Sequence, residues 1–598
     1  MLRLFTRPHT SSYSLLRTIT VTPMSHRHKR PKIQPSASTA TLSTASSASA
    51  TGAAPSTSRP PSSLGDRGHF SDRKFQDLPI SSKLKQNIKH EFLTEVQAAT
   101  IEPALSGKDI LVQAKTGTGK TIGFLLPAIE KTLRSPVRPK GTPILVLSPT
   151  RELAQQISTE AQTLLPQSDL RIITVTGGTR NPSTDLQKFL ERDHDIVVAT
   201  PGRLHDYFTG PRKTEAYEKF HGLQTLVLDE VDRLLDGGFA RELDGVISML
   251  PKTKRQNLFF SATISNNIKQ VAKKYNDGSE YTFISTLKED EMNVHQHVHQ
   301  SYIITPFEKH IPTLLALLHL DSIKHPLPHV TTSTPSLSPG TTGPETLSKV
   351  MVFFPTARHV SFAMEVLSSE SIKKSLPPLL EIHSRKSQSA RTKAAEAFKN
   401  AKSAILLSSD VAARGIDFPG VTLVIQVGIP SSAEQYVHRL GRTARAGAKG
   451  QGIIILDPQE QPFHTTREMQ KTTTISPYIS SPSSHEAKEL ETYIQTYAQH
   501  VQNTLETVSA NNPTVIGSAY VSFLGYYKGQ ARMMKWSSER LVEEANRYAK
   551  QVMGWTDALP PAISPKAVGM MGLKGVRGLN IMKPPRPERE QSRGDRRQ

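Results

Sequence analysis

The stretch that decides the fold is Ala114-Lys-Thr-Gly-Thr-Gly-Lys-Thr121. It follows the apolar run Ile110–Gln113 and precedes a segment with helical periodicity. Glycines let such a loop wrap closely, so that backbone N–H groups at the helix start point at a phosphate. Lys120 then reaches the β- and γ-phosphates, and the Thr121 hydroxyl coordinates Mg²⁺. The stretch predicts a nucleotide-phosphate site, although Ala114 stands where the general pattern has Gly.

A later apolar run ends in acids, in Leu226-Val-Leu-Asp-Glu-Val-Asp-Arg-Leu-Leu-Asp236. Open α/β sheets place their ligands at the carboxyl ends of parallel strands. There Asp229 can hold the Mg²⁺ shell, largely through water, and Glu230 can orient and deprotonate a water. The alternative is a strand that simply leaves the core and meets solvent. The phosphate loop on the same expected sheet favours a nucleotide hydrolysis site.

Short β-branched runs alternate with helical segments from about residue 70, and the alternation starts again after about residue 295. Near-continuous apolar strands separated by helices predict a parallel sheet covered on both faces. The predicted fold is therefore α/β, with two tandem doubly wound domains at 70–290 and 295–470. A low-complexity insertion is expected at 325–349, a helical extension at 485–560 and a basic, disordered tail at 561–598. The expected strands are Ile110–Gln113, Ile144–Ser148, Ile172–Thr176, Ile196–Thr200, Thr225–Leu228, Leu258–Ser261, Ile303–Thr305, Val350–Phe354, Ala404–Leu407, Leu423–Val427 and Ile453–Leu456.

Composition narrows the class of protein further. The 598 residues carry a formal net charge of +21, which favours a polyanionic partner, nucleic acid first and an anionic membrane second. The alternative is that the charge serves solubility alone. The absence of cysteine excludes disulfides and Cys-containing zinc sites. No apolar run approaches the ~20 residues of a membrane span, so no membrane insertion is expected.

Residues 1–65 contain no Asp or Glu, and Arg3, Arg7 and Arg17 stand among apolar and hydroxyl residues. An Arg-rich, Ser-rich, acid-poor start is typical of an organelle transit peptide. The alternative is nuclear targeting by the basic cluster 26–32. The missing acids favour a mitochondrial transit peptide with a disordered linker, and a location in the mitochondrial matrix.

The ordered series of motifs over roughly residues 70–460 resembles the DEAD-box RNA helicases. Each tripeptide alone is weakly specific, whereas the whole series in this order is very specific. Val231 replaces the Ala of the family's name motif, and only local repacking is expected from that exchange. The motifs are Ala114–Thr121, Pro149-Thr-Arg-Glu-Leu-Ala154, Gly177-Gly178, Thr200-Pro-Gly-Arg-Leu204, Asp229-Glu-Val-Asp232, Ser261-Ala-Thr263, Ser409-Asp410, Ala413-Arg-Gly-Ile-Asp417 and His438-Arg-Leu-Gly-Arg-Thr-Ala-Arg445.

The resemblance implies two RecA-like domains that hydrolyse ATP with Mg²⁺ in an RNA-dependent way. Arg442 and Arg445 are then expected to reach the γ-phosphate from the second domain, and His438 to couple the site to Ser261-Ala-Thr263. Gln97 can pair with adenine through its amide. The sequence leaves open whether Phe75 stacks on the base, because its spacing to Gln97 is short and Lys89-His90 replaces the usual Gly and aromatic. The implied cofactor residues are Gln97, Phe75, Ala114, Lys115, Thr116, Gly117, Thr118, Gly119, Lys120, Thr121 and, at the ribose, Asp417.

The same resemblance implies an RNA path across both domains, through contacts to phosphates and 2′-hydroxyls that read no sequence. The expected contacts are Thr150, Arg151, Gly178, Thr200, Arg203, Thr356, Gln388, Arg391 and Ser409. The segments 519–528 and 568–577 further resemble the extension of fungal mitochondrial DEAD-box RNA chaperones, which assist group I and group II intron splicing. A monomeric mitochondrial RNA chaperone is therefore expected. A nucleolar ribosome-assembly helicase and a non-catalytic, ATP-gated RNA clamp remain as alternatives.

Overall fold

The structure is a computed structural model that describes residues 70–137, 139–165, 170–178, 181–236, 239–276, 280–287, 298–325, 347–412, 418–444 and 450–582. The expected transit peptide and linker, most of the expected insertion, and the two expected site residues Asp417 and Arg445 lie outside the described residues. Among the described helices, none combines the length and hydropathy that crossing a membrane requires.

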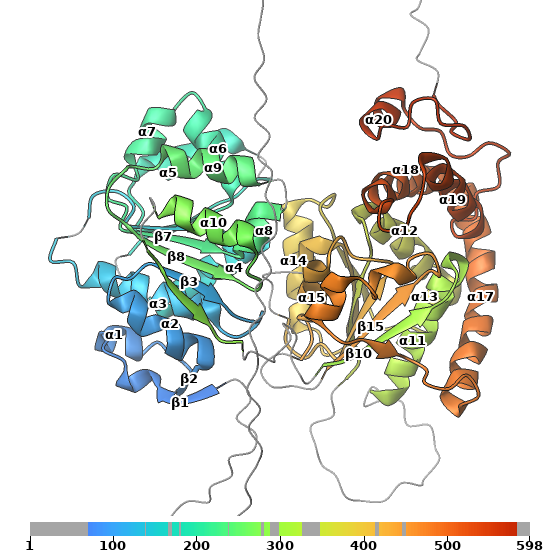
Figure 1. Ribbon diagram of the computed structural model, residues 1–598, viewed down its shortest axis with the longest axis horizontal. Coiled ribbons are helices and arrows are strands. Elements are labelled where there is room, and N and C mark those ends of the chain that lie inside the picture. Colours follow the sequence, from blue (N-terminus) through green and yellow to red (C-terminus); the bar gives the residue numbers. More distant parts are fainter. Residues whose placement is uncertain are drawn as a thin grey trace, which may run out of the picture. The chain divides into compact units, whose positions relative to one another are not determined.

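The first domain contains a parallel sheet with the strand order β5-β6-β4-β7-β8-β3-β9. Figure 1 labels its neighbouring strands β7, β8 and β3. Alternate residues of a strand point to opposite faces. In β4, Ile144 and Val146 accordingly enter one hydrophobic cluster while Leu145 and Leu147 enter another. Helices therefore cover both faces, as the continuous apolar strands predict. The strands are β3 (Ile110–Gln113), β4 (Ile144–Leu147), β5 (Ile172–Val175), β6 (Ile196–Ala199), β7 (Thr225–Asp229), β8 (Gln256–Ser261) and β9 (Thr282–Ser285).

The helices of the first domain are α1 (Ser82–Lys85), α2 (Glu95–Leu105), α3 (Lys120–Leu133), α4 (Arg151–Leu164), α5 (Pro182–Glu191), α6 (Pro201–Thr209), α7 (Lys213–Glu218), α8 (Val231–Asp236), α9 (Ala240–Met249) and α10 (Asn266–Tyr275). Helices α1 and α2 precede the first strand of this sheet, and the other helices of the first domain lie between its strands in the sequence. A two-stranded antiparallel ribbon, β1 (Phe70–Lys74) with β2 (Phe92–Thr94), lies outside the main sheet and was not expected from the sequence.

The second domain repeats the first strand for strand, since its parallel sheet has the order β12-β13-β11-β14-β15-β10-β16. The two tandem RecA-like sheets are thus confirmed. Its strands are β10 (Val298–Ile304), β11 (Lys349–Phe353), β12 (Leu379–Ile382), β13 (Ala404–Ser408), β14 (Leu423–Val427), β15 (Gly450–Leu456) and β16 (Ser476–Pro477). Its helices are α11 (His310–Lys324), α12 (Ala357–Leu367), α13 (Glu370–Lys373), α14 (Gln388–Asn400), α15 (Ala433–Leu440) and α16 (Arg467–Thr472).

The C-terminal extension is built on the second domain rather than beside it. It consists of α17 (His485–Asn511), α18 (Pro513–Gln530), α19 (Ser538–Gln551) and α20 (Pro565–Met570). Leu490 and Ile494 of α17 belong to the same hydrophobic cluster as Val350 of β11. Phe523 of α18 belongs to the same cluster as Ile454 of β15. The extension and the second domain therefore share their cores.

The prediction that the chain is a disordered tail from residue 561 is wrong for residues 561–582. After α20 the chain makes successive turns in a tripeptide repeat of glycine, an apolar residue and a polar residue: Gly572-Leu573-Lys574, Gly575-Val576-Arg577 and Gly578-Leu579-Asn580. The three glycines have φ of 64°, 79° and 92°, a region that favours glycine. The apolar members pack on the cluster that contains Phe523, and Leu573 is fully buried. High Pro, Gly and Arg content suggested disorder, but the period of three places one apolar side chain per turn against the core.

Cutting the chain after Ser564 should therefore destabilise the second domain, whereas cutting after Met582 should not. The first cut removes Val568 and Leu573, both buried in the shared core. Burial of each aliphatic side chain contributes ~1.5–3 kcal/mol, so a loss of roughly 3–6 kcal/mol is expected. Thermal unfolding of the two truncated proteins and the full chain measures the difference. Equal unfolding temperatures for both truncations would contradict the docking of this segment.

Candidate nucleotide site and RNA face

The phosphate loop is shaped by its neighbours in the sheet. The Ala114 N–H donates to the Ser261 carbonyl over 3.1 Å, and the Ala114 side chain is buried in the core. An alanine at this first position is therefore compatible with the loop. Thr118 Oγ1 donates to the Lys115 carbonyl over 2.8 Å, and Lys120 Nζ donates to the Ala114 carbonyl over 2.9 Å. Lys120 is thus held inside the loop at the start of α3.

The loop approaches Gln97 so closely that Gly119 admits no side chain. Gly119 has φ of 84°, and a Cβ there would lie 2.4 Å from Gln97 Nε2. Gln97 Nε2 donates to the Gly119 carbonyl over 3.1 Å, and Gln97 Oε1 accepts from the Thr94 N–H over 2.9 Å. Each end of the amide keeps one further hydrogen-bonding position, so Gln97 can still pair with a base edge.

A cavity of about 330 Å³ opens at the loop. Its lining includes six of the expected cofactor residues but not Ala114, Lys115 or Thr118. Its aromatic rings come from Phe70, His90 and Phe92, on or just before the β1–β2 ribbon. Phe75 does not reach the cavity: it is 1% exposed and packs in the core. The structure therefore corrects the choice of Phe75 as a base-stacking ring. The further lining residues are Thr94, Gln97, Thr116, Gly117, Gly119, Lys120, Thr121, Ile122, Leu153, Gln156, Glu160, Asp229, Glu230 and Arg442.

Asp229 and Glu230 stand where β7 ends, at the same sheet edge as the phosphate loop. Burial, followed by repulsion from Glu230, raises the pKa of Asp229, while the Lys120 ammonium opposes the shift. Burial lowers the pKa of Lys120, against the attraction of Asp229 and Glu230. Glu230 has φ of 52°, a left-handed conformation that is strained for a non-glycine residue. Strain of this kind is typical of a functional site whose surroundings fix one side-chain direction.

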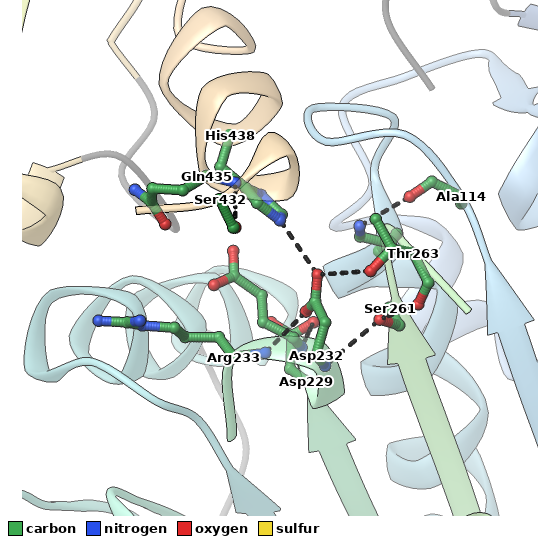
Figure 2. A network of polar contacts seen from close by, with 11 residues as sticks. Ala114, Asp229, Asp232, Arg233, Ser261, Thr263, Ser432, Gln435 and His438 are labelled. Carbon is green, nitrogen blue, oxygen red and sulfur yellow. Dashed lines mark hydrogen bonds and ion pairs between the residues drawn. The ribbon is translucent and has the colours of Figure 1, made fainter. Parts of the chain in front are cut away.

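Asp232 connects the two domains instead of facing the cavity (Figure 2). Its carboxylate lies 3.0 Å from His438 Nε2 of α15 and accepts from Thr263 Oγ1 over 3.3 Å. The backbone N–H of Asp232 donates to Ser261 Oγ over 3.4 Å. His438 therefore meets Ser261-Ala-Thr263 through Asp232. This intermediary was not identified from the sequence, where Asp232 was read only as part of a motif.

Arg442 follows α15 and lines the cavity together with Glu230 and Lys120. It is 2% exposed, and its neighbour Gly441 lies so close to the phosphate loop that a Cβ there would be 2.3 Å from Thr116 Oγ1. The nucleotide cavity is therefore lined from both domains, as the finger prediction requires.

The expected RNA residues of the first domain gather at the carboxyl ends of β4, β5 and β6. Thr150 caps α4, and its side chain accepts from the Leu153 N–H over 3.3 Å. Arg203 Nε donates to the Thr176 carbonyl over 3.3 Å, and Thr200 directly precedes α6. The Arg151 guanidinium crosses Gly178, where a Cβ would lie 1.9 Å from Nη1. These residues therefore form one polar edge of the sheet. Because Gly178 has no side chain, the Arg151 guanidinium can lie against its backbone.

Gly178→Ala should weaken RNA binding by about tenfold, because the new Cβ displaces Arg151 and loses one charged phosphate contact worth ~1.5 kcal/mol. Gly107→Ala is the matched control, since Gly107 has φ of 83° but open space around its missing Cβ. Both variants carry the same backbone strain. RNA titrations of the two proteins measure the effect, and equal affinities would contradict the placement of Arg151.

The expected RNA residues of the second domain are partly engaged with protein groups. Thr356 follows β11 and caps α12, and Ser409 follows β13. Gln388 Nε2 donates to Glu152 Oε1 of the first domain over 3.1 Å, and Arg391 forms an ion pair with the same carboxylate. Glu152 was not singled out from the sequence, although it lies in the Pro149–Ala154 motif. The sequence did contain a signal for Glu152: it directly follows Arg151, an expected RNA contact, and so lies at the same edge of the sheet.

Two parallel sheets of equal strand order and a nucleotide cavity lined from both domains define a two-domain ATP-hydrolysing enzyme. The DEAD/DEAH box helicase family matches residues 94–271, and the helicase conserved C-terminal domain matches residues 344–447. DEAD-box ATP-dependent RNA helicase 26 of Oryza sativa subsp. japonica is 39% identical over 517 residues, which cover 86% of this chain and 87% of that protein. The chain therefore belongs to the DEAD-box ATP-dependent RNA helicases.

Two further relatives cover most of the chain. ATP-dependent RNA helicase mss116, mitochondrial, of Aspergillus oryzae is 37% identical over 516 residues, which cover 84% of this chain and 74% of that protein. The solved structure of Mss116p bound to single-stranded RNA and AMP-PNP is similar with a TM-score of 0.68 at 27% identity. That similarity covers 83% of this chain and 92% of the other.

Proposed function

We propose that this RNA helicase is a monomeric RNA chaperone of the mitochondrial matrix, which uses ATP and Mg²⁺ to open short duplexes in structured RNA such as introns. The observation that carries the proposal is the extension, whose core is continuous with that of the second domain. Similarity to the mitochondrial fungal relative extends over 516 residues, more than the two helicase domains together. A similarity that covers 84% of this chain reaches at least into the first helix of the extension.

The residues at the start of α3 and at the end of β7 fit a magnesium ion. Thr121 and Asp229 both line the cavity, and Asp229 is a buried carboxylate whose raised pKa a cation would lower. Bound there, Mg²⁺ supplies positive charge that neutralises the developing charge on the phosphates. Glu230 accepts the proton of the attacking water, Lys120 binds the β- and γ-phosphates, and Arg442 donates to the γ-phosphate from the second domain. ATP hydrolysis then depends on contact between both domains.

Buried polar atoms at the junction of Glu152, Gln388 and Arg391 support a preference for RNA. Glu152 Oε2, Gln388 Oε1 and Arg391 Nε are buried and make no hydrogen bond within the described residues. Where the contacts of Glu152 open to RNA, two acceptors beside one donor suit a 2′-hydroxyl, which can both donate and accept. Single-stranded RNA should therefore stimulate ATP hydrolysis, while DNA of the same sequence should not. Equal stimulation by DNA would contradict this recognition.

The proposed location is tested with residues 1–65 fused to a fluorescent reporter. The fusion should enter mitochondria, because a positive, acid-free start suits import. Replacing Arg3, Arg7 and Arg17 by Gln should abolish import, whereas replacing the basic residues of the 26–32 cluster should not. Nuclear accumulation of the unchanged fusion would instead favour a nucleolar ribosome-assembly helicase.

A further inference from the structure

Helix α18 presents three side chains, four residues apart, that hydrogen-bond to the second domain. Ser522 Oγ donates to Thr356 Oγ1 over 2.9 Å, Tyr526 OH donates to the Ile429 carbonyl over 2.7 Å, and Gln530 Nε2 donates to the Ser431 carbonyl over 3.5 Å. Residues at i, i+4 and i+8 share one face of a helix. This face therefore contacts the segment 429–431 at two points.

The extension acts on both backbone polar groups of Ile429, directly on the carbonyl and through Glu460 of the second domain on the N–H. Tyr526 binds the carbonyl, and the N–H donates to Glu460 Oε1 over 3.2 Å. The same carboxylate oxygen accepts from Tyr527 OH over 2.6 Å, and Glu460 Oε2 accepts from the Asp457 N–H over 2.9 Å. Glu460 is fully buried. Ile429 is thus fixed by two neighbouring tyrosines, one acting directly and one through a carboxylate.

The segment that begins at Ile429 leads directly into α15. Ser432 caps this helix by accepting from the Gln435 N–H over 3.2 Å. The helix then delivers His438 to Asp232 and ends just before Arg442, which lines the nucleotide cavity. At 1.5 Å per residue α15 is about 12 Å long, so a tilt of roughly 5° at its start moves its far end by about 1 Å. A misplacement of about 1 Å can cost on the order of a hundredfold in rate.

We propose that Tyr526 is a positioning residue for ATP hydrolysis: its hydrogen bond to Ile429, supported by Tyr527 and Glu460, sets the start of α15 so that Arg442 and His438 reach the nucleotide site. The proposal rests on the proposed role of Arg442. It gives the extension a part in turnover that is separate from any contact with RNA. Tyr526 does not line the nucleotide cavity and acts only through α15.

A matched control is present on the same helix. Tyr520 is fully buried, and its OH donates to Asn546 Oδ1 over 2.8 Å. That bond joins α18 to α19 within the extension and does not reach the segment before α15. Tyr526→Phe and Tyr520→Phe each remove one hydrogen-bonded hydroxyl from α18. A purely structural role for both hydroxyls predicts similar losses of stability and similar activities.

The experiment compares the full-length wild type with Tyr526→Phe, Tyr520→Phe and Arg442→Ala at saturating RNA. Tyr526→Phe should lower kcat for ATP about fivefold to tenfold while KM for ATP changes less than about twofold, because positioning acts on the transition state. Tyr520→Phe should keep kcat within about twofold of wild type. Thermal unfolding should show both Tyr variants folded at the assay temperature.

The outcomes separate the two proposals. If Arg442→Ala abolishes turnover but the two Tyr variants have equal kcat, the positioning role of Tyr526 is wrong and the proposed site stands. If Arg442→Ala keeps turnover, the proposed site itself is wrong. An unchanged kcat for Tyr526→Phe, or a rise in KM with kcat unchanged, also overturns the positioning role.

Discussion

Glu230→Gln should reduce RNA-stimulated ATP hydrolysis by roughly 10²- to 10⁴-fold, the usual contribution of a general base. Gln keeps the size of the side chain and its place after β7, but it cannot accept the proton of the attacking water. Glu230 is buried beside Asp229, and it lines the cavity with Lys120. Affinity for ATP and for RNA should therefore stay close to wild type while turnover falls.

Phosphate release measures the turnover of this variant, and titration with a fluorescent ATP analogue measures its nucleotide affinity. Lys120→Ala is the comparison, because it removes the group that binds the phosphates and should weaken nucleotide affinity itself. Near-normal hydrolysis by Glu230→Gln would show that another group activates the water.

Arg442→Ala should lower turnover further still, by about 10³- to 10⁵-fold, the range found for arginine fingers in phosphoryl transfer. The side chain is buried in the cavity, although it comes from the second domain. Arg442→Lys should recover little activity, because an ammonium keeps the charge but loses the planar fork of donors. Comparing the Ala and Lys variants therefore distinguishes the contribution of the guanidinium's shape from that of its positive charge.

Single-turnover hydrolysis with saturating RNA measures the loss for both Arg442 variants. Arg467→Ala is the matched control, since it removes one exposed positive charge from the same domain at the start of α16. Its turnover should equal that of wild type. A comparable loss in the Arg467 and Arg442 variants would mean that overall charge, rather than a finger, supports hydrolysis.

The sequence predicted the two sheets because buried parallel strands read as continuous apolar runs between glycine-rich or acidic turns. Of the expected strands, Ile110–Gln113 and Leu423–Val427 match the structure residue for residue. The β9 and β12 strands were missed: most of their residues are half-buried or exposed, so their apolar signal is weak. The phosphate loop and the acids after β7 were predictable for another reason. Phosphate and Mg²⁺ chemistry restricts the residue types at fixed spacing.

Contacts between distant segments could not be derived in that way. The sequence around Glu152 does not indicate that Arg391 is its ion-pair partner. Likewise, His438 contacts Asp232 although the two residues are 206 positions apart in the sequence. The sequence left open whether Phe75 stacks on the base, because only its packing with Leu78 and Leu84 in the core decides its burial. The folded segment after residue 560 was missed because its period of three differs from the periods of helices and strands.

Both domains have the same strand order, but the loops that follow their corresponding strands β3 and β10 differ. This difference bears on how many ATP molecules the two domains bind. The loop after β3 is Ala114–Thr121, whereas β10, which has the same place in the second sheet, continues into Thr305-Pro-Phe307 without a glycine-rich turn. We therefore expect one molecule of ATP, bound in the cavity lined from both domains, to serve both. Because its ligands are divided between them, we expect ADP to leave only when the domains separate. If RNA contacts both domains as proposed, separation also releases the RNA, and we expect each ATP to yield one local opening event instead of steps along a strand.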